Sequence, residues 1–320
     1  MTPDSQFGDI GVPVTLTGKN LALTTTTLAL PPLSGTARVP DNTPETATFQ
    51  FTGIPAGDYM LTLPASAVQG AAASVPVTVK TGQTANPILT LAYPAWTEGT
   101  PDAKISDALT GTALDAKWTA ADLGGPSAAG SAKEDSTGLT VMADGGGWDN
   151  GSDDAFNYVY QSIPAGDWVA YVTVAAGTSG GMAGLMASSS VKAAPRAANF
   201  AISVTSGMGI DSEGRVADGT QIFPFGETAP GTDPGNGGTA PALPLILKMR
   251  KVGATFAGFY STDGGKTQHF IGGLAPQFDP TASLLLGLAT TSSTDGTLDK
   301  ATYQNFVVAP LAAPAPAAGQ

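Results

Sequence analysis

The sequence contains no cysteine and only one histidine, His269, among 320 residues. The absence of cysteine excludes disulfides, thiolate metal sites and cysteine nucleophiles. A single histidine excludes multi-histidine zinc sites and most catalytic triads. Charged residues make up only 12% of the chain, and no apolar run is long enough for a membrane-spanning helix, so we expect no membrane insertion.

Glycine and proline are abundant instead, with 41 and 25 residues, and 42% of the chain is hydrophobic. This composition favours many turns over long helices and still provides enough apolar material for cores. The formal net charge is −12, from 14 basic and 26 acidic residues. That balance argues against nucleic acid as a partner and against anionic membrane surfaces.

Alternating apolar and polar residues predict short, half-buried strands in the first 93 residues. The alternation covers residues 12–17, 47–51, 59–63 and 75–79, and turn-forming residues occupy 53–58 and 80–83. This spacing predicts a small antiparallel sandwich.

The segment Phe49–Leu63 resembles the carboxypeptidase-regulatory-like, or prealbumin-like, β-sandwich domain. It contains a strand, a turn of the type G-ϕ-P-A-G-x-Y beginning at Gly53, and a second strand, and residues 77–84 are similar to that family's final hairpin. The resemblance covers roughly residues 8–93. It implies an Ig/prealbumin-like sandwich over residues 1–93 that acts as a non-catalytic spacer or attachment unit.

Residues 94–104 are interpreted as a linker, and residues 105–309 as a second, larger β-sandwich with no convincing helix. Gly, Pro and Asp interrupt the strand pattern over residues 212–244, which predicts a long surface loop. Residues 310–320 form a Pro/Ala-rich tail, which is interpreted as a loose terminus or an extended arm. We therefore predict an all-β chain of two modules.

The second region resembles the concanavalin A-like lectin/glucanase superfamily, in its DUF1349-type branch of jelly-roll domains. The motifs, in chain order, are Trp148-Asp149-Asn150 before residues 156–161, then Gly181–Ala187, then 247–253 leading into 260–267, then 286–289 and 301–306. The resemblance covers most of residues 105–309. It implies a jelly-roll fold and either glycan binding or passive structure, with enzymes a minority.

The densest acidic cluster lies between Asp144 and Asp154, on a glycine-rich loop. Oxygen ligands from Asp149, Asn150, Asp153 and Asp154 would suit Ca²⁺, the one cofactor that the sequence suggests. Trp148, with Asp149 and Asn150, would then offer a platform for a sugar. The alternative is a solvated acidic turn with no ligand.

Phe223 and Phe225 lie within the predicted loop and are candidates for an exposed interface or a glycan contact. Aromatic residues on the predicted strands are expected to belong to the core; these are Trp118, Tyr158, Tyr160, Trp168, Tyr171 and Phe200. Residues 261–268 resemble an Asp-box, a structural hairpin turn. His269, just after it, is expected to have no catalytic role.

Glycosidases of this fold need two carboxylates across the scissile bond, placed on one strand in a pattern such as E-x-D-x-x-E. We find no such pattern, and the sequence predicts no catalytic residue. The protein is therefore expected not to be an enzyme.

Two β modules without catalytic residues favour display and recognition. The first residues, Met1 to Ser5, have neither a basic nor an apolar stretch and predict no secretory signal. The leading hypothesis is a surface protein of a phage or phage-like particle, such as a capsid decoration, head-fibre or tail-spike component, made in the cytoplasm and located on the virion surface.

In this hypothesis the N-terminal domain would bind other particle proteins, the C-terminal domain would bind host-surface polysaccharide, and the protein would form a homo-oligomer. Two alternatives remain. One is an extracellular or cell-surface carbohydrate-binding or adhesion protein of a bacterium, and the other is a polysaccharide-cleaving enzyme.

Overall fold

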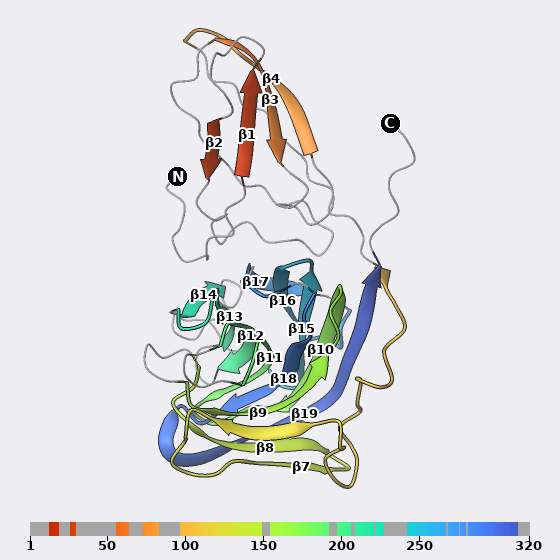
Figure 1. The fold of residues 1–320 in the computed structure, drawn as a ribbon. Helices are drawn as coiled ribbons and strands as arrows, with labels where there is room; N and C mark the ends of the chain where they lie inside the picture. Colours follow the sequence, from red (N-terminus) through yellow and green to blue (C-terminus); the bar gives the residue numbers. More distant parts are fainter. Residues whose placement is uncertain are drawn as a thin grey trace. The chain divides into compact units, whose positions relative to one another are not determined.

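The computed structural model describes residues 13–18, 26–29, 56–63, 73–82, 97–148, 154–191, 197–205, 209–220, 222–226, 242–266, 268–274, 276–279 and 281–312. The chain divides into two compact units (Figure 1), one of Met1–Thr97 with Ala312–Gln320 and one of Glu98–Leu311. This division lies inside the predicted linker. Every regular element in the described ranges is a strand, so the predicted all-β class is confirmed there, and none of them is a helix that could cross a membrane.

The first unit contains one antiparallel sheet in the order β2-β1-β3-β4. Its strands are β1 (Pro13–Gly18), β2 (Thr26–Ala29), β3 (Gly57–Leu63) and β4 (Ala73–Val79). Tyr59 and Val77 lie opposite each other in the β3–β4 pair and are both buried, whereas Met60 is exposed. Pro76 lies in β4, the last strand in the sheet order of the described residues, and edge strands tolerate proline. The predicted strand over 47–51 lies outside the described residues.

The second unit is built from two antiparallel sheets. The eight-stranded sheet has the order β17-β16-β15-β10-β19-β8-β7, with β5 paired to β19. Its strands are β5 (Thr97–Glu98), β7 (Ser131–Asp135), β8 (Gly138–Gly145), β10 (Trp168–Ala176), β15 (Leu245–Val252), β16 (Thr255–Ser261), β17 (His269–Leu274) and β19 (Thr294–Ala312).

The seven-stranded sheet has the order β14-β13-β12-β11-β18-β9-β6. Its strands are β6 (Thr119–Leu123), β9 (Phe156–Ile163), β11 (Met182–Ser188), β12 (Asn199–Thr205), β13 (Gly209–Arg215), β14 (Ile222–Gly226) and β18 (Leu284–Thr291). Two of these strands fall on residues predicted to be a loop. That prediction is wrong for 212–215 and 222–226. Pairing with β12 places the polar, glycine-containing residues 212–215 in the sheet, and pairing with β13 places 222–226 there. Residues 227–241 lie outside the described ranges.

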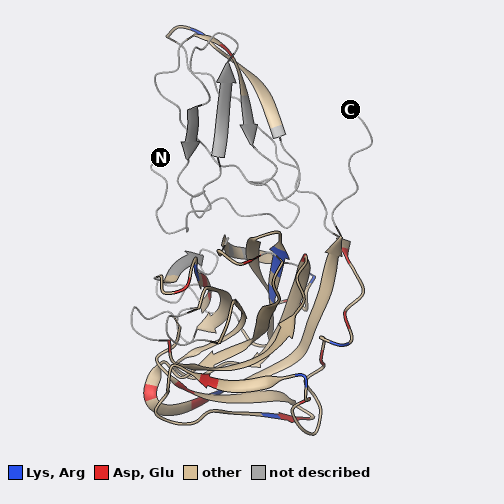
Figure 2. Cartoon of the chain, in the orientation of Figure 1, with Lys and Arg blue, Asp and Glu red and all other residues tan. Residues whose placement is uncertain are grey.

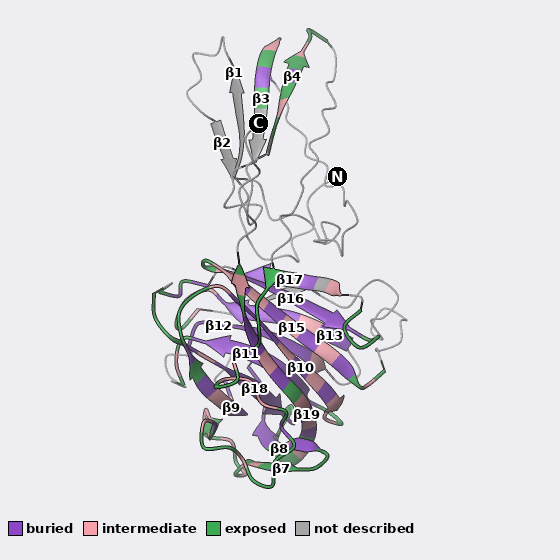
Figure 3. Ribbon diagram, turned by 90° about the vertical axis from the view of Figure 1, so that its right-hand side faces the viewer, coloured by how far each residue is buried: buried purple, intermediate pink, exposed green. Residues whose placement is uncertain are grey.

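The main core fills the space between the two sheets. Strand β15 shows why: Leu245, Leu247 and Met249 are buried in that core, and the alternate residues Lys248 and Arg250 point to the outer face. The purple segments in Figure 3 mark the buried residues. Four of the six predicted core aromatics are confirmed as buried, namely Trp118, Tyr158, Trp168 and Phe200. The prediction is wrong for Tyr160 and Tyr171, which are half-buried.

A second, smaller cluster covers the other face of the seven-stranded sheet. It contains Trp148, Phe156, Tyr158, Met182, Met186, Ala201 and Ala289. The sheet therefore has apolar side chains packed on both faces. Its outer face, which carries the second cluster, is the region in which most of the predicted site residues fall.

The first three residues of the predicted Pro/Ala tail belong to a strand, so the prediction of a loose terminus is wrong for them. Pro310, Leu311 and Ala312 end strand β19, and the N–H of Leu311 donates to the carbonyl of Asp167 at 3.0 Å. Residues 313–320 lie outside the described part of the chain.

Candidate functional site

Trp148 is fully buried, so the prediction of an exposed sugar platform is wrong for its ring. The ring packs edge-to-face against Phe156, with centroids 5.3 Å apart. Three glycines precede it, and two of them, Gly145 and Gly147, have φ of 112° and 106°, a region that favours glycine. This backbone conformation directs the indole ring of Trp148 toward the second apolar cluster. Asp149 and Asn150, predicted to share the platform, lie outside the described residues.

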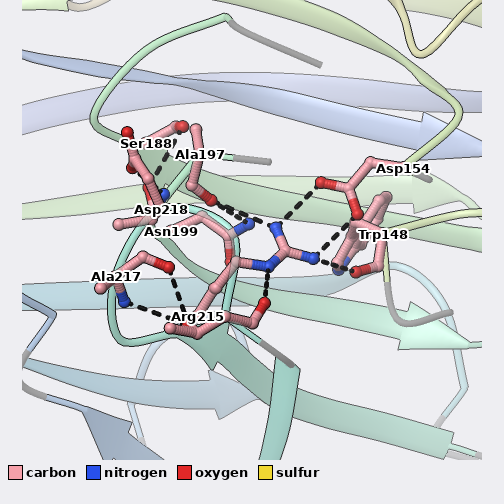
Figure 4. Close-up of polar contacts among 10 residues, drawn as sticks. Trp148, Asp154, Ser188, Ala197, Asn199, Arg215, Ala217 and Asp218 are labelled. Atoms are coloured by element: carbon pink, nitrogen blue, oxygen red, sulfur yellow. Dashed lines mark hydrogen bonds and ion pairs between the residues drawn. The ribbon is translucent and has the colours of Figure 1, made fainter. Parts of the chain in front are cut away.

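Asp154, one of the four predicted calcium ligands, binds an arginine instead. Both of its carboxylate oxygens accept hydrogen bonds from Arg215, from Nη2 at 2.8 Å and from Nη1 at 2.9 Å (Figure 4). The guanidinium also donates to the carbonyls of Trp148, Ala197 and Thr220. The side chain of Arg215 has no exposed surface. A fixed protein cation thus takes the place that a metal ion would have at Asp154.

The other three predicted calcium ligands, Asp149, Asn150 and Asp153, lie outside the described residues, so calcium binding there stays a prediction. Within the described ranges, no group of three His, Asp or Glu side chains could hold a metal ion.

Phe223 and Phe225 belong to strand β14, which pairs with β13 through Gly214 and Glu213. Their side chains are outside the described part of the structure. Their proposed role as an exposed interface stays a prediction, but the segment that carries them is a strand at the edge of the seven-stranded sheet.

Two smaller predictions concern the hairpin after β16. The Asp-box-like turn is structural, because the Ser261 hydroxyl donates to Asp263 at 2.8 Å and accepts from the N–H of Gly265 at 2.9 Å. His269 is half-buried, and its ring stacks on Tyr260 at 4.9 Å. The turn therefore fixes the hairpin without offering a reactive group.

Strand β12 carries a row of polar atoms that sequence reasoning missed. Asn199, Ser203 and Thr205 alternate with core residues and so share the outer face of the sheet. The buried atoms Asn199 Oδ1, Ser203 Oγ and Thr205 Oγ1 have no hydrogen-bond partner in the structure. We call this set the β12 row. The indole N–H of Trp148, also buried, has none either.

A small pocket opens at the Asn199 end of the β12 row. Its walls include Asp154, Tyr158, Ser188 and Asn199, and its volume is about 10 Å³, which is room for about one water molecule. Burial, with a smaller contribution from Tyr160, raises the pKa of Tyr158 well above its ordinary value, so its phenol stays protonated. That hydroxyl donates to the main chain at Met186 or Leu285.

Strand β13 adds two carboxylates beside the row. Asp211 lies opposite Ser203 and Glu213 lies opposite Ala201, so both side chains are on the outer face. Residues two apart on a strand are separated by about 7 Å. The Asp-x-Glu alternation at 211–213 was the available sequence signal, and it was missed because residues from 212 onward were interpreted as a loop.

The outer face of the seven-stranded sheet therefore combines hydrogen-bonding groups without partners, aromatic rings and a carboxylate pair. Tyr158 and Tyr160, two residues apart on β9, stack at 5.0 Å and form the aromatic part. Such a face can bind a ligand that offers hydroxyl groups and apolar C–H surfaces.

Comparisons with known proteins add no family assignment: no family model matches the chain, and no curated protein matches it. Three solved structures illustrate the similarities that were found. The chain is similar to the GH43 BlXynB protein from Bacillus licheniformis, with 16% identity, a TM-score of 0.46 and coverage of 85% of this chain and 58% of that one.

It is also similar to a protein of unknown function with a galectin-like fold from Bacillus subtilis, with 12% identity, a TM-score of 0.43 and coverage of 68% and 98%. The third is the carbohydrate-binding module CBM66 from Bacillus subtilis, with 16% identity, a TM-score of 0.38 and coverage of 60% and 95%. The strand pairing of this chain is the basis for assigning its second unit to a two-sheet β fold.

Proposed function

We propose that the second unit binds carbohydrate on the outer face of the seven-stranded sheet and does not cleave it. The observation that carries this proposal is the β12 row. A buried polar atom without a partner costs about 1–3 kcal/mol, and native proteins rarely leave several on one face. Sugar hydroxyls both donate and accept hydrogen bonds, so one ligand class could satisfy Asn199, Ser203 and Thr205 together.

The geometry of the row supports an extended ligand. Asn199 and Thr205 are six residues apart on one strand, a span of about 20 Å. The pocket beside Asn199 is where a ligand would enter. Since Ser203 is fully buried, a sugar reaches it only by displacing the side chains above it. Half-buried Tyr160 offers an apolar surface near this entry.

A glycan array, followed by calorimetric titration of the strongest ligand, tests the proposal. Thr205→Val and Asn199→Ala are expected to weaken binding at least fivefold, because each removes one hydrogen-bonding group. Thr173→Val is the matched control, since Thr173 lies on β10, on the outer face of the other sheet. Absence of binding across the array, or equal loss in the control, would contradict the proposal.

A second candidate function is polysaccharide cleavage, and Asp211 with Glu213 is the observation that favours it. Inverting glycosidases hold two carboxyl groups about 6.5–9.5 Å apart, and alternate residues of a strand are spaced in this range. Incubation of the bound glycan with wild type, Asp211→Asn and Glu213→Gln decides between the two functions. Turnover that disappears in either variant while binding remains would identify an enzyme.

The setting of this binding unit is part of the same proposal. We propose that it is displayed on a phage-like particle, with the first unit as the attachment module and with several copies assembled together. The lack of cysteine and the two β modules are compatible with this setting but do not require it. Imaging of material from the native source tests it: copies arranged on particles would support it, and protein found only on cells or in solution would contradict it.

A further inference from the structure

Two basic side chains lie beside two aromatic rings on the outer face of the eight-stranded sheet, which is the sheet that does not contain the β12 row. Tyr171 on β10, Lys248 on β15 and Phe259 on β16 lie opposite one another across three neighbouring strands. Their sequence neighbours point into the core, so all three side chains share the outer face. Figure 2 shows that basic residues gather on β15, in a chain with a net charge of −12.

The ammonium of Lys248 lies between the two aromatic rings. It is 5.4 Å from the centroid of Tyr171 and 5.9 Å from that of Phe259, within the range of cation–π attraction. Arg250, two residues along the same face, lies 5.2 Å from the Phe259 centroid. Tyr171 and Phe259 are two strands apart, about 10 Å. We call these four residues the cation–aromatic patch.

A carboxylate already occupies this patch. Glu98 Oε1 lies 2.7 Å from Lys248 Nζ, and the Glu98 side chain is 38% exposed. Glu98 thus shows that the Lys248 ammonium can pair with a carboxylate. The Lys248 side chain is 17% exposed, so the pair lies partly at the surface. Ion pairs at the surface stabilise a protein by no more than about 1 kcal/mol, so a carboxylate from solution can compete with Glu98.

We propose that the cation–aromatic patch is a second ligand site, which binds uronic-acid saccharides, and that Glu98 occupies its carboxylate position in the free protein. The ligand carboxylate replaces Glu98 at Lys248, and the half-buried ring of Tyr171 contacts the apolar C–H face of the sugar. Phe259 is only 6% exposed, so its ring holds the Lys248 ammonium in place and does not itself contact the ligand. A neutral sugar has no group to displace Glu98. The site is independent of the β12 row, which lies on the other sheet.

Oligogalacturonate is the probe, with a neutral galactose oligomer and a polyglutamate peptide as comparison ligands. The full chain is titrated by calorimetry at low salt. We expect oligogalacturonate to bind, Lys248→Met to weaken it at least tenfold, and Glu98→Gln to strengthen it at least threefold because the competing carboxylate is gone. Lys133→Met is the control, since Lys133 is an exposed lysine on β7 of the same sheet.

Thermal unfolding of each variant checks that it is folded before binding is compared. The proposal is overturned if oligogalacturonate does not bind, if Glu98→Gln fails to strengthen binding, or if Lys133→Met weakens it as much as Lys248→Met. It is also overturned if polyglutamate binds as tightly, because the patch would then be a docking site for acidic peptides. Loss of binding in Asn199→Ala with no change in Lys248→Met would assign the sugar acid to the β12 row.

Discussion

Arg215 and Asp154, which are 61 residues apart in the chain, form a two-point ion pair that joins the end of β13 to the start of β9. The same guanidinium donates to the main chain at Trp148, so it fastens both sides of the glycine-rich loop that the sequence suggested as a calcium site. This loop is held by protein contacts at its base.

Removing one partner of this pair is expected to destabilise the protein strongly. Arg215→Met leaves the Asp154 carboxylate buried without its cation, and such losses cost about 3–5 kcal/mol. Arg215→Lys should also be poorly tolerated, because an ammonium cannot replace the planar fork. Urea unfolding of the full chain measures both changes.

The double variant Arg215→Met with Asp154→Leu is the informative control. Since it removes both charges, it should lose less stability than Arg215→Met alone. If Arg215→Met lowers the free energy of unfolding by less than about 1 kcal/mol, the ion pair with Asp154 does not hold the loop in place.

Trp148 gives a second prediction, which separates a core residue from a sugar platform. Trp148→Ala should cost about 3–5 kcal/mol of stability, as expected for a buried aromatic side chain, and Trp148→Phe should cost less. Denaturant unfolding measures both. If Trp148→Ala keeps its stability but binds glycan more weakly, the platform interpretation is correct and the burial argument is wrong.

Regular alternation made much of the fold predictable. In β15, Leu247 and Met249 alternate with Lys248 and Arg250, and this pattern indicates a strand with one buried face. The same reasoning predicted β1, β3 and β4 of the first unit. It depends only on local spacing, which the sequence displays directly.

Strand β13 shows where this reasoning stops. Its sequence, Gly-Ile-Asp-Ser-Glu-Gly-Arg, has little β propensity, and it becomes a strand through seven pairings with β12. The inward turn of Trp148 and the contact between Arg215 and Asp154 also depend on residues distant in sequence. No local pattern carries that information, so the candidate site was predicted less well than the fold.

Asp144 gives a prediction about low pH. Its buried carboxylate accepts main-chain hydrogen bonds from Ala128 at 2.6 Å, Gly145 at 2.7 Å and Thr297 at 3.1 Å. Burial alone would raise the pKa of Asp144, but these bonds and one from Gly296 outweigh it and hold the pKa below its ordinary value. The folded state therefore favours the ionised form.

Because the folded pKa of Asp144 is lowered, its contribution to stability is complete above the unfolded pKa near 3.9 and is lost as the pH falls through the folded value. Asp144→Asn should cost about 2 kcal/mol at pH 7, and the difference from wild type should shrink in strong acid. Asp135→Asn is the comparison at an exposed turn. Hydrogen bonds from the Thr137 hydroxyl and N–H lower the pKa of Asp135 as well, so this variant should show the same pH dependence with a smaller loss. An unchanged difference between pH 7 and pH 2, measured by urea unfolding, would contradict this assignment.

Glu134 is the opposite case, because the folded state favours the neutral form of its buried carboxyl group. It is 2% exposed, its Oε2 accepts one hydrogen bond from Gly111 at 3.2 Å, and its Oε1 has no partner in the structure. Burial raises the pKa of Glu134, and the neighbouring carboxylates of Asp107 and Asp115 raise it further. Ionisation at neutral pH therefore costs stability.

Glu134→Gln is expected to increase stability at pH 7 by about 1 kcal/mol, because it removes a buried charge and keeps the acceptor for Gly111. A raised folded pKa means that wild type regains this stability as the pH falls from the folded value to the unfolded value near 4.3. The advantage of the variant should therefore disappear near pH 4, as measured by urea unfolding at both pH values. Asp115→Asn should move this window to lower pH, since it removes one repelling charge, and an equal advantage at pH 4 and pH 7 would show that Glu134 is not the group responsible.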